Sequence, residues 1–118
     1  MSHSSSGSLA HLPAEQPYPG VSRRTIDGAG ASVVFYAMEA NARFPLHRHP
    51  QEQITVVREG SLRMRIGGDD LELHADDFNV VPGGVEHGIT AGADGATLLV
   101  VLTPRREAGE QVELLSET

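Results

Sequence analysis

Two histidines and a glutamine are spaced so that their side chains can act together. His47 and His49 are one residue apart in HRHPQEQ, and Gln53 follows four residues later. Residues two apart on a strand point to the same face, so these three are predicted to share one face, with Glu52 pointing away. His87 begins another predicted strand after a Pro-Gly-Gly turn. If the two strands are antiparallel neighbours, His87 lies opposite His47 and His49, and three imidazoles and an amide oxygen converge. This predicts a metal site, because burying three imidazoles without a metal is costly.

Each of these residues also has a simpler interpretation. An H-x-H taken alone is more often a pair of surface or core histidines than a pair of ligands. Gln53 has the alternative role of a structural hydrogen-bonding group. His3 and His11 lie in a terminal segment, and His74 precedes an Ala-Asp-Asp turn, so these three are predicted to be solvated.

The elements that must position this group are short β-prone runs separated by turn residues. The runs cover residues 33–38, 43–49, 53–59, 62–67, 71–74, 78–82, 86–91 and 96–104, with 21–26 as a further candidate. Eight or nine short strands in about a hundred residues predict an all-β, antiparallel sandwich or barrel. In LRMRI, Leu62, Met64 and Ile66 share one face, and Arg63 and Arg65 share the other, as a solvated face or as inward groups for an anionic substrate.

Some of these strands are apolar on both faces. In QITVV and LLVVL, neither face is clearly polar. A small single-layer barrel cannot bury both faces of a strand by itself, so a second sheet or a second subunit must cover one of them. The sequence therefore predicts a homodimer.

The chain divides into three parts. Residues 1–20, rich in Ser, Pro and Gly, are predicted to form a flexible arm that packs on a partner or stays disordered. Residues 21–106 are the predicted barrel, and 107–118 are an acidic tail in which only EAGEQVELLSE has a pattern compatible with a short helical turn. We find no secretory signal pattern and no apolar run of about 18 residues, so a cytoplasmic location is expected.

Composition excludes several kinds of chemistry. The 118 residues contain no Cys, and all 9 basic residues are Arg, which excludes thiolate ligands, a thiol nucleophile and a Schiff-base lysine. The net charge of -7 without a basic stripe argues against nucleic acids and anionic membranes as partners. A small-molecule substrate is the expected partner.

These residues resemble the first of the two motifs of the cupin superfamily. That motif has the form G, five residues, H-x-H, three or four residues, E, six residues, G. His47 and His49 supply the H-x-H, Gln53 takes the place of the Glu, and Gly60 follows after six residues. Ala42 is assigned to the place of the opening Gly.

The second motif has the form G, five residues, P-x-G, two residues, H, three residues, N. Residues 82–84 and His87 match it, Asp76 replaces the Gly, and Ala91 stands where Asn is common. The resemblance covers roughly residues 33 to 104. It implies a double-stranded β-helix, the jelly-roll or cupin barrel, and a metal held by His47, His49, Gln53 and His87.

The sequence H-x-H-x-x-E-Q is also similar to a subgroup of small cupins that includes the protein that opens unsaturated uronate rings in pectin and alginate breakdown. Arg106 matches an Arg of that group. The group carries an inward Asp where Val100 stands and a Phe where Leu102 stands. Losing the Asp removes the obvious polar partner of a sugar acid, so the resemblance implies the fold and the metal site, but not the uronate substrate.

The implied site is one divalent transition metal, with Fe, Mn, Ni and Zn left open. Three neutral imidazoles and a neutral amide leave its charge uncompensated, which favours redox-neutral Lewis-acid chemistry on a small sugar acid or keto or hydroxy acid, as in an isomerase, a lyase or a ring-opening enzyme. Arg106 or Arg48 would hold a carboxylate, and Glu39 or Tyr36 would serve as the base. An Fe(II) dioxygenase and a non-enzymatic ligand-binding or sensing cupin remain the alternatives.

Overall fold

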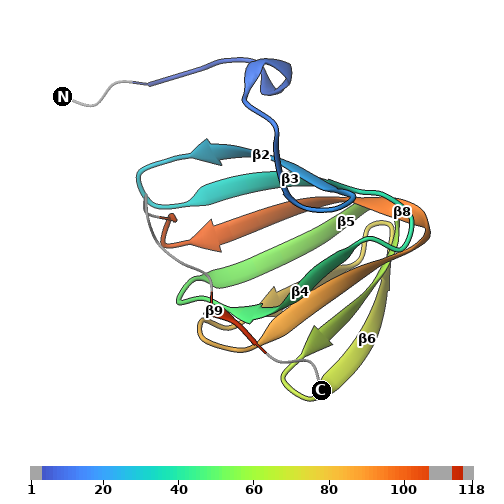
Figure 1. The fold of residues 1–118 in the computed structure, drawn as a ribbon. Helices are drawn as coiled ribbons and strands as arrows, with labels where there is room; N and C mark the ends of the chain where they lie inside the picture. Colours follow the sequence, from blue (N-terminus) through green and yellow to red (C-terminus); the bar gives the residue numbers. More distant parts are fainter. Residues whose placement is uncertain (1–3, 107–112, 116–118) are drawn as a thin grey trace.

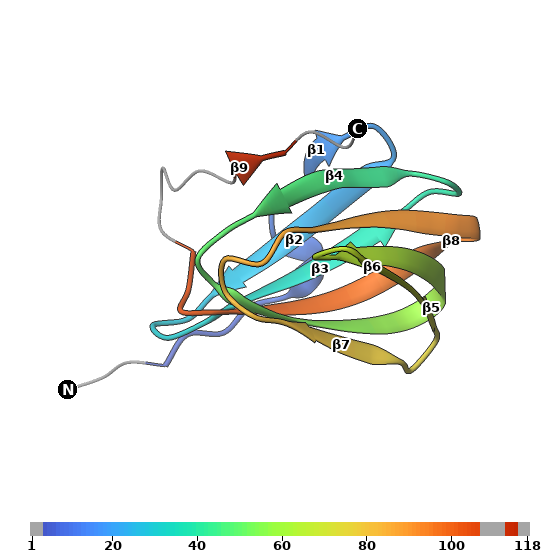
Figure 2. The same cartoon turned by 90° about the horizontal axis from the view of Figure 1, so that it is seen from below.

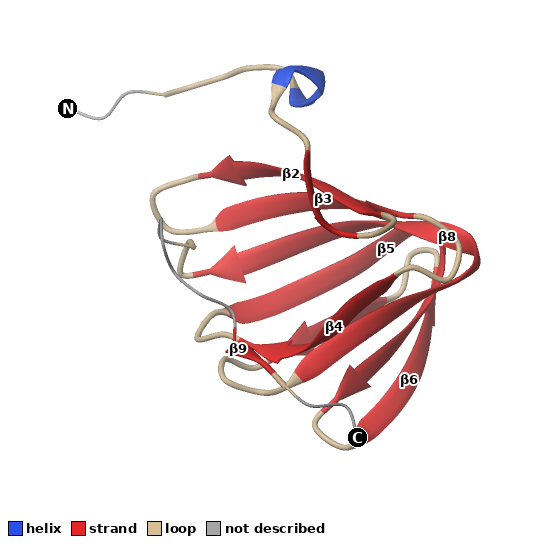
Figure 3. Ribbon diagram, viewed as in Figure 1, coloured by secondary structure: helices blue, strands red, loops and turns tan. Residues whose placement is uncertain are grey.

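The computed structural model describes residues 4–106 and 113–115. All of its paired strands are antiparallel, which confirms the predicted all-β class (Figures 1 and 3). The elements are η1 (Leu9–His11), β1 (Glu15–Tyr18), β2 (Val21–Asp27), β3 (Ser32–Met38), β4 (Arg43–Arg48), β5 (Glu52–Ile66), β6 (Asp69–His74), β7 (Phe78–Val81), β8 (His87–Thr103) and β9 (Glu113–Leu114).

Two long strands, β5 and β8, belong to both layers of the barrel. The first half of β5 pairs with β7 and with the second half of β8, which continues to β3, β2 and β1. The second half of β5 pairs with β6 and with the first half of β8, which continues to β4 and β9. We call these layers the first and the second sheet; Figure 2 shows them facing each other. The arrangement is the jelly-roll barrel expected from the sequence.

The long strands replace four separate runs that the sequence predicts. The predicted breaks at EGS and AGADG are positions where β5 and β8 pass from one sheet to the other without ending. Gly60 and Gly95 have φ of 76° and 74°, and the register shifts between Gly60 and Leu62. A side chain at residue 60 would collide with the carbonyl group of Gly95. The glycines therefore mark bulges that bend the sheet, where the sequence predicts turns.

The core lies between the two sheets and follows the predicted alternation. Leu62 and Met64 are buried, and Arg63 and Arg65 are exposed, so this pair of arginines forms a solvated face. Along the first half of β5, the buried side chains include Gln53 and Thr55.

The terminal segments differ in part from the predicted arm and tail. Within residues 1–20, β1 pairs with β2, and η1 precedes it. In the tail, Glu113–Leu114 form a strand against β4 where the sequence suggested a helical turn, because the edge of β4 offers unpaired backbone groups. The remainder of that suggested turn, residues 107–112 and 116–117, lies outside the described residues. Among the residues that the structure describes, no helix has the length and apolar character needed to span a membrane.

Candidate metal centre

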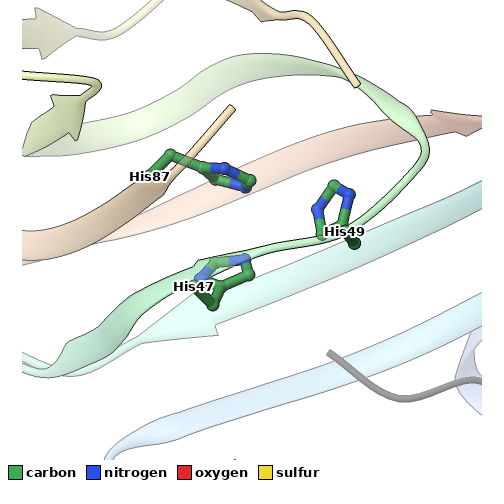
Figure 4. Close-up of side chains that lie close together, drawn as sticks. All are labelled: His47, His49 and His87. Carbon is green, nitrogen blue, oxygen red and sulfur yellow. The ribbon is translucent and has the colours of Figure 1, made fainter. Parts of the chain in front are cut away.

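Three imidazole rings meet where β4 and β8 lie side by side. His47 and His87 are direct cross-strand partners, and His49 follows the end of β4. The ring of His47 lies 4.2 Å from that of His87 and 5.4 Å from that of His49, measured between centroids. All three side chains are buried, and one ligand nitrogen from each lies within 4.8 Å of the others. Figure 4 shows the three rings gathered in the space between these strands.

The Pro-Gly-Gly turn holds His49 as well as placing His87. The backbone N–H of Gly84 donates to the His49 carbonyl at 2.8 Å. A side chain at Gly83 would collide with the Pro50 carbonyl, so the close approach of the two loops requires glycine there. One short turn therefore fixes histidines from two distant parts of the sequence.

Two left-handed residues stand near the motif positions where glycine is expected. Asp76 has φ of 73°, which agrees with its assignment to the place of a Gly. The corresponding residue before β4 is Asn41, with φ of 62°, and five residues separate it from His47. The assignment of Ala42 to that place is therefore one residue too late. Asn and Asp tolerate this conformation better than other non-glycine residues.

The second nitrogen of each ring fixes which atom points into the site. The Nδ1–H groups donate to the carbonyls of residues 45, 51 and 85, at 2.8 Å from His47, 3.1 Å from His49 and 2.9 Å from His87. A carbonyl oxygen only accepts, so Nδ1 carries the proton in each neutral ring and Nε2 presents a lone pair. Such backbone contacts are typical of metal-ligating histidines, whose orientation they fix.

Gln53 faces two of these lone pairs. Its Oε1 lies 3.1 Å from the Nε2 of His49 and 3.1 Å from the Nε2 of His87, while its Nε2 donates to Thr55 Oγ1 at 2.9 Å. An amide oxygen and a neutral imidazole nitrogen are both acceptors, so these contacts repel unless a proton or a cation lies between them.

The environment of the rings disfavours a proton between the imidazole nitrogens and the amide oxygen. Burial is the main cause that lowers the pKa of His47 to about 3, and the nearby His87 and the charge of Arg106 act in the same direction, against the hydrogen bond to Pro45. Burial likewise lowers the pKa of His87 to about 4. Both rings are therefore neutral at pH 7. The residues fit a divalent transition metal, which the lone pairs of nitrogen and oxygen donors would bind.

A small cavity adjoins this group. Its volume is about 20 Å³, enough for one ion or one water molecule. Apart from His47 and Gln53, its wall consists of aromatic and aliphatic side chains, namely Tyr36, Met38, Phe44, Ile89, Leu98 and Val100. Val100, where the ring-opening subgroup carries an Asp, thus faces the site. A sugar acid does not fit inside this volume, and only its chelating atoms would reach the metal.

Of the other candidate residues, two are connected with the site and two are exposed. Tyr36 lines the cavity, and the charge of Arg106 acts on His47. Arg48, the last residue of β4, is exposed, which agrees with its place between two buried histidines in the sequence. Glu39 is exposed at the end of β3 and lines a surface hollow with Gly20 and Val21, apart from the histidines.

Arg23 is a residue near the site that the sequence analysis did not single out. It is the cross-strand partner of Tyr36, and it forms an ion pair with Glu15 at 3.3 Å. Burial alone would lower the pKa of Arg23, but the attraction of Tyr36 and Glu15, with a hydrogen bond to each, raises it. The sequence VSRRTI contains a signal for this position. Val21 and Arg23 lie on the same face of the strand, and Val21 is buried, so Arg23 also points inward.

Comparison with known proteins gives a family and a fold. The sequence matches the family described as "Cupin domain" over residues 34–103, which is more than half of the chain. No curated protein matches the sequence. An RmlC-like cupin from Shewanella frigidimarina NCIMB 400 is similar in structure, with a TM-score of 0.78 and 26% identity over 91% of this chain and 95% of that one.

Two further solved structures share the fold at lower identity. KdgF from Halomonas sp. has a TM-score of 0.78 and 22% identity, over 86% of this chain and 97% of KdgF. Oxalate decarboxylase from Bacillus subtilis has a TM-score of 0.82 and 20% identity, over 96% of this chain. The present chain corresponds to only 33% of the length of the decarboxylase.

Proposed function

Because the chain belongs to the cupin family, we propose that its three-histidine centre, completed by Gln53, binds one divalent transition metal and catalyses a redox-neutral reaction of a small oxygenated acid. The reaction class is isomerisation, lyase chemistry or ring opening. One observation carries the proposal. The Nε2 atom of His87 and the Oε1 atom of Gln53 face each other in a buried place. The lowered pKa of His87 leaves this nitrogen unprotonated at pH 7, so a cation is needed between the two acceptors.

The metal would supply Lewis acidity, polarising a carbonyl or hydroxyl group of the substrate. The chain's own contribution is a set of four neutral donors, His47, His49, His87 and Gln53. Since none of them compensates the double positive charge, this set favours the divalent over the trivalent state. Fe, Mn, Ni and Zn all suit such donors; a solved oxalate decarboxylase of the same fold is described as having Mn(II) centres.

The substrate is proposed to be anionic because of Arg106. The charge of Arg106 acts on His47, and Arg106 is not among the residues that line the cavity. A guanidinium group binds a carboxylate in two parallel hydrogen bonds. Oxalate decarboxylase, which is named for a small dicarboxylic acid and shares the fold, supports a small acid as the substrate class. Val100 argues against the uronate itself.

Tyr36 is the proposed acid or base. It lines the cavity beside His47 and Gln53, and the guanidinium of Arg23 forms a hydrogen bond with its hydroxyl group. Glu39 lines a separate surface hollow and is not proposed for this role.

The first test is the metal content of the tag-free protein, measured by plasma mass spectrometry, beside the His87→Ala and His74→Ala variants. His74 is exposed, so its variant controls for adventitious binding to histidine. We expect about one equivalent of metal in the wild type and in His74→Ala, and a loss in His87→Ala. Equal metal content in all three proteins would contradict the proposal.

Turnover is tested next, with the metal-loaded protein and small keto, hydroxy and dicarboxylic acids, while oxygen consumption is recorded. Product formation without oxygen uptake supports the redox-neutral proposal. Oxygen uptake would indicate the dioxygenase, and metal-dependent thermal stabilisation without any turnover would indicate a binding protein. The cytoplasmic location expected from the sequence remains a prediction that cell fractionation would check.

A further inference from the structure

The hairpin that joins β2 to β3 holds the segment of chain that follows β8. β8 ends at Thr103, and two contacts tie the residues beyond it to the hairpin. The Arg105 Nη1 group donates to the Gly28 carbonyl at 3.3 Å, and the backbone N–H of Arg106 donates to Ser32 Oγ at 3.1 Å. Figure 1 shows the end of β8 and this hairpin at the same end of the first sheet. The position of Arg106 is therefore set by the start of β3.

The Ser32 hydroxyl group is itself fixed in place. Ser32 has an exposed fraction of 0%, and its hydroxyl donates to Asp27 Oδ1 at 2.6 Å. These two residues are direct cross-strand partners, and a hydrogen bond from the Gly28 N–H to the Ala31 carbonyl at 2.8 Å closes the hairpin. A hydroxyl group has one proton, so donation to the carboxylate leaves its lone pairs for the N–H of Arg106. Asp27 thus orients the hydroxyl group that Ser32 presents.

Ser32 lies in a cross-strand row that also contains a proposed ligand of the metal. It pairs with Leu102 of β8, which in turn pairs with Gln53 of β5. Adjacent strands are about 4.8 Å apart, so the backbones of Ser32 and Gln53 are roughly 10 Å apart. The side chain of Arg106 starts beside Ser32, and its charge acts on His47. The hairpin thus holds a guanidinium group within electrostatic range of the metal centre.

The burial of the hydroxyl group indicates more than the pairing of one backbone group. A backbone N–H beyond the end of a strand needs an acceptor, but a water molecule can supply one at the surface. Asp27 is exposed and Arg106 is half-buried, whereas the hydroxyl group between them belongs to a completely buried residue. Burying it costs free energy that its two hydrogen bonds must offset. In return, Arg106 has one fixed position, which a water molecule would not provide.

We propose that Ser32 and Asp27 are positioning residues, which hold Arg106 so that its guanidinium group binds the carboxylate of the substrate at the metal centre. This role rests on the proposed function, since it requires a small acid as a ligand of the metal. A carboxylate bound in two parallel hydrogen bonds needs a guanidinium group in one orientation. A side chain that is held before the substrate arrives loses less conformational entropy on binding. Ser32 therefore raises the affinity for an anion without touching it.

The first test needs neither metal nor substrate. NMR spectroscopy of the isotope-labelled full chain measures the hydrogen exchange of the Arg106 amide and the relaxation of its Nε–H group. In Ser32→Ala we expect the amide to exchange roughly 3- to 10-fold faster, because one hydrogen bond is lost, and the Nε–H group to become more mobile. Ser22→Ala is the matched control on β2, where the hydroxyl group donates to the Ala37 carbonyl at 3.5 Å. Unchanged exchange and relaxation in Ser32→Ala overturn the proposal.

The second test compares an anionic with a neutral ligand of the cobalt(II)-loaded protein. Oxalate and imidazole are each titrated while the visible absorption records binding to the metal. We expect Arg106→Gln to weaken oxalate binding by about 10- to 100-fold and Ser32→Ala by about tenfold, because a hydrogen-bonded charge is lost or misplaced. Imidazole is neutral, so both variants should bind it as the wild type does. If Ser32→Ala weakens both ligands equally, it disturbs the metal centre as a whole, and the proposal is wrong.

Combined variants show whether Ser32 acts through Arg106. Ser32→Ala/Arg106→Gln should bind oxalate no more weakly than Arg106→Gln alone, whereas additive losses contradict the proposal. Asp27→Asn keeps an acceptor for the hydroxyl group and should retain the oxalate affinity, while Asp27→Ala should lower it. Equal losses in these two variants overturn the role of Asp27.

The measurements separate the role of Ser32 from the proposed function. A protein that takes up no cobalt(II) contradicts the proposed metal centre, whereas unchanged mobility of Arg106 in Ser32→Ala contradicts the positioning role alone. Oxalate binding that is weakened in Arg106→Gln but kept in Ser32→Ala likewise leaves the metal centre intact and overturns the positioning role.

Discussion

At the scale of single residues, the choice of Gln over Glu at position 53 sets the charge of the metal centre. We predict that Gln53→Glu binds a divalent metal at least tenfold more tightly, because a carboxylate compensates charge that the amide leaves open. Chelator competition measures the affinity. Glu52→Gln is the control, since that side chain is exposed and makes the inverse change one residue away. Unchanged affinity in Gln53→Glu would show that residue 53 does not contact the metal.

Thr55 orients the amide that Gln53 presents. We predict that Thr55→Val, which has the same shape, weakens metal affinity by about 10- to 100-fold, the usual effect of losing a partner of a ligand. The buried Gln53 Nε2 would lose its acceptor, which costs about 1–3 kcal/mol of unfolding free energy. Titration calorimetry and urea denaturation measure the two effects. Thr90→Val, on the outward side of β8, should change neither; equal effects at both positions would refute an orienting role.

At the scale of elements, the bend of β5 depends on Gly60. We predict that Gly60→Ala lowers the free energy of unfolding by at least about 1–3 kcal/mol, because φ is 76° and the new methyl group meets the Gly95 carbonyl. Gly68→Ala is the control, since nothing lies within 4 Å of its position. Urea denaturation compares the two variants. If Gly68→Ala is the more damaging of the two, the bulge does not limit the fold.

The elements also show which features the sequence can predict. Alternation in LRMRI and in residues 53–57 predicts the buried face correctly, because side-chain direction on a strand is a local property. The continuity of β5 through Gly60 is not predictable, since a glycine that bends a paired strand and one that ends it look alike.

The site divides in the same way. The parity of His47 and His49 follows from local spacing, and the Pro-Gly-Gly turn locates His87. The exact pairing of His47 with His87, the contact of Arg23 with Tyr36, and the strand at Glu113–Leu114 depend on register between distant segments. The hydrophobic pattern of one strand fixes which face is buried, but the exact pairing also depends on the partner strand and on the turns that join them.

At the scale of the whole molecule, the metal centre makes stability depend on pH. In the metal-free protein, the pKa values of His47 and His87 are lowered to about 3 and 4, against 6.5 for the unfolded chain. Between about pH 6.5 and 4 the unfolded state therefore binds more protons, and stability falls as the pH falls. Each histidine contributes a slope of up to about 1.4 kcal/mol per pH unit, which fades below its folded pKa.

We predict that urea denaturation in excess chelator shows this decline from pH 7 to 4. His87→Gln should reduce its slope, because one of the two imidazoles whose pKa is lowered no longer takes part. A bound metal adds stability at pH 7, since it binds only the folded state, and acid removes that gain as protons compete for the ligands. The loaded protein should therefore lose more stability than the metal-free protein over the same interval. Parallel pH profiles with and without metal would show that the histidines do not hold it.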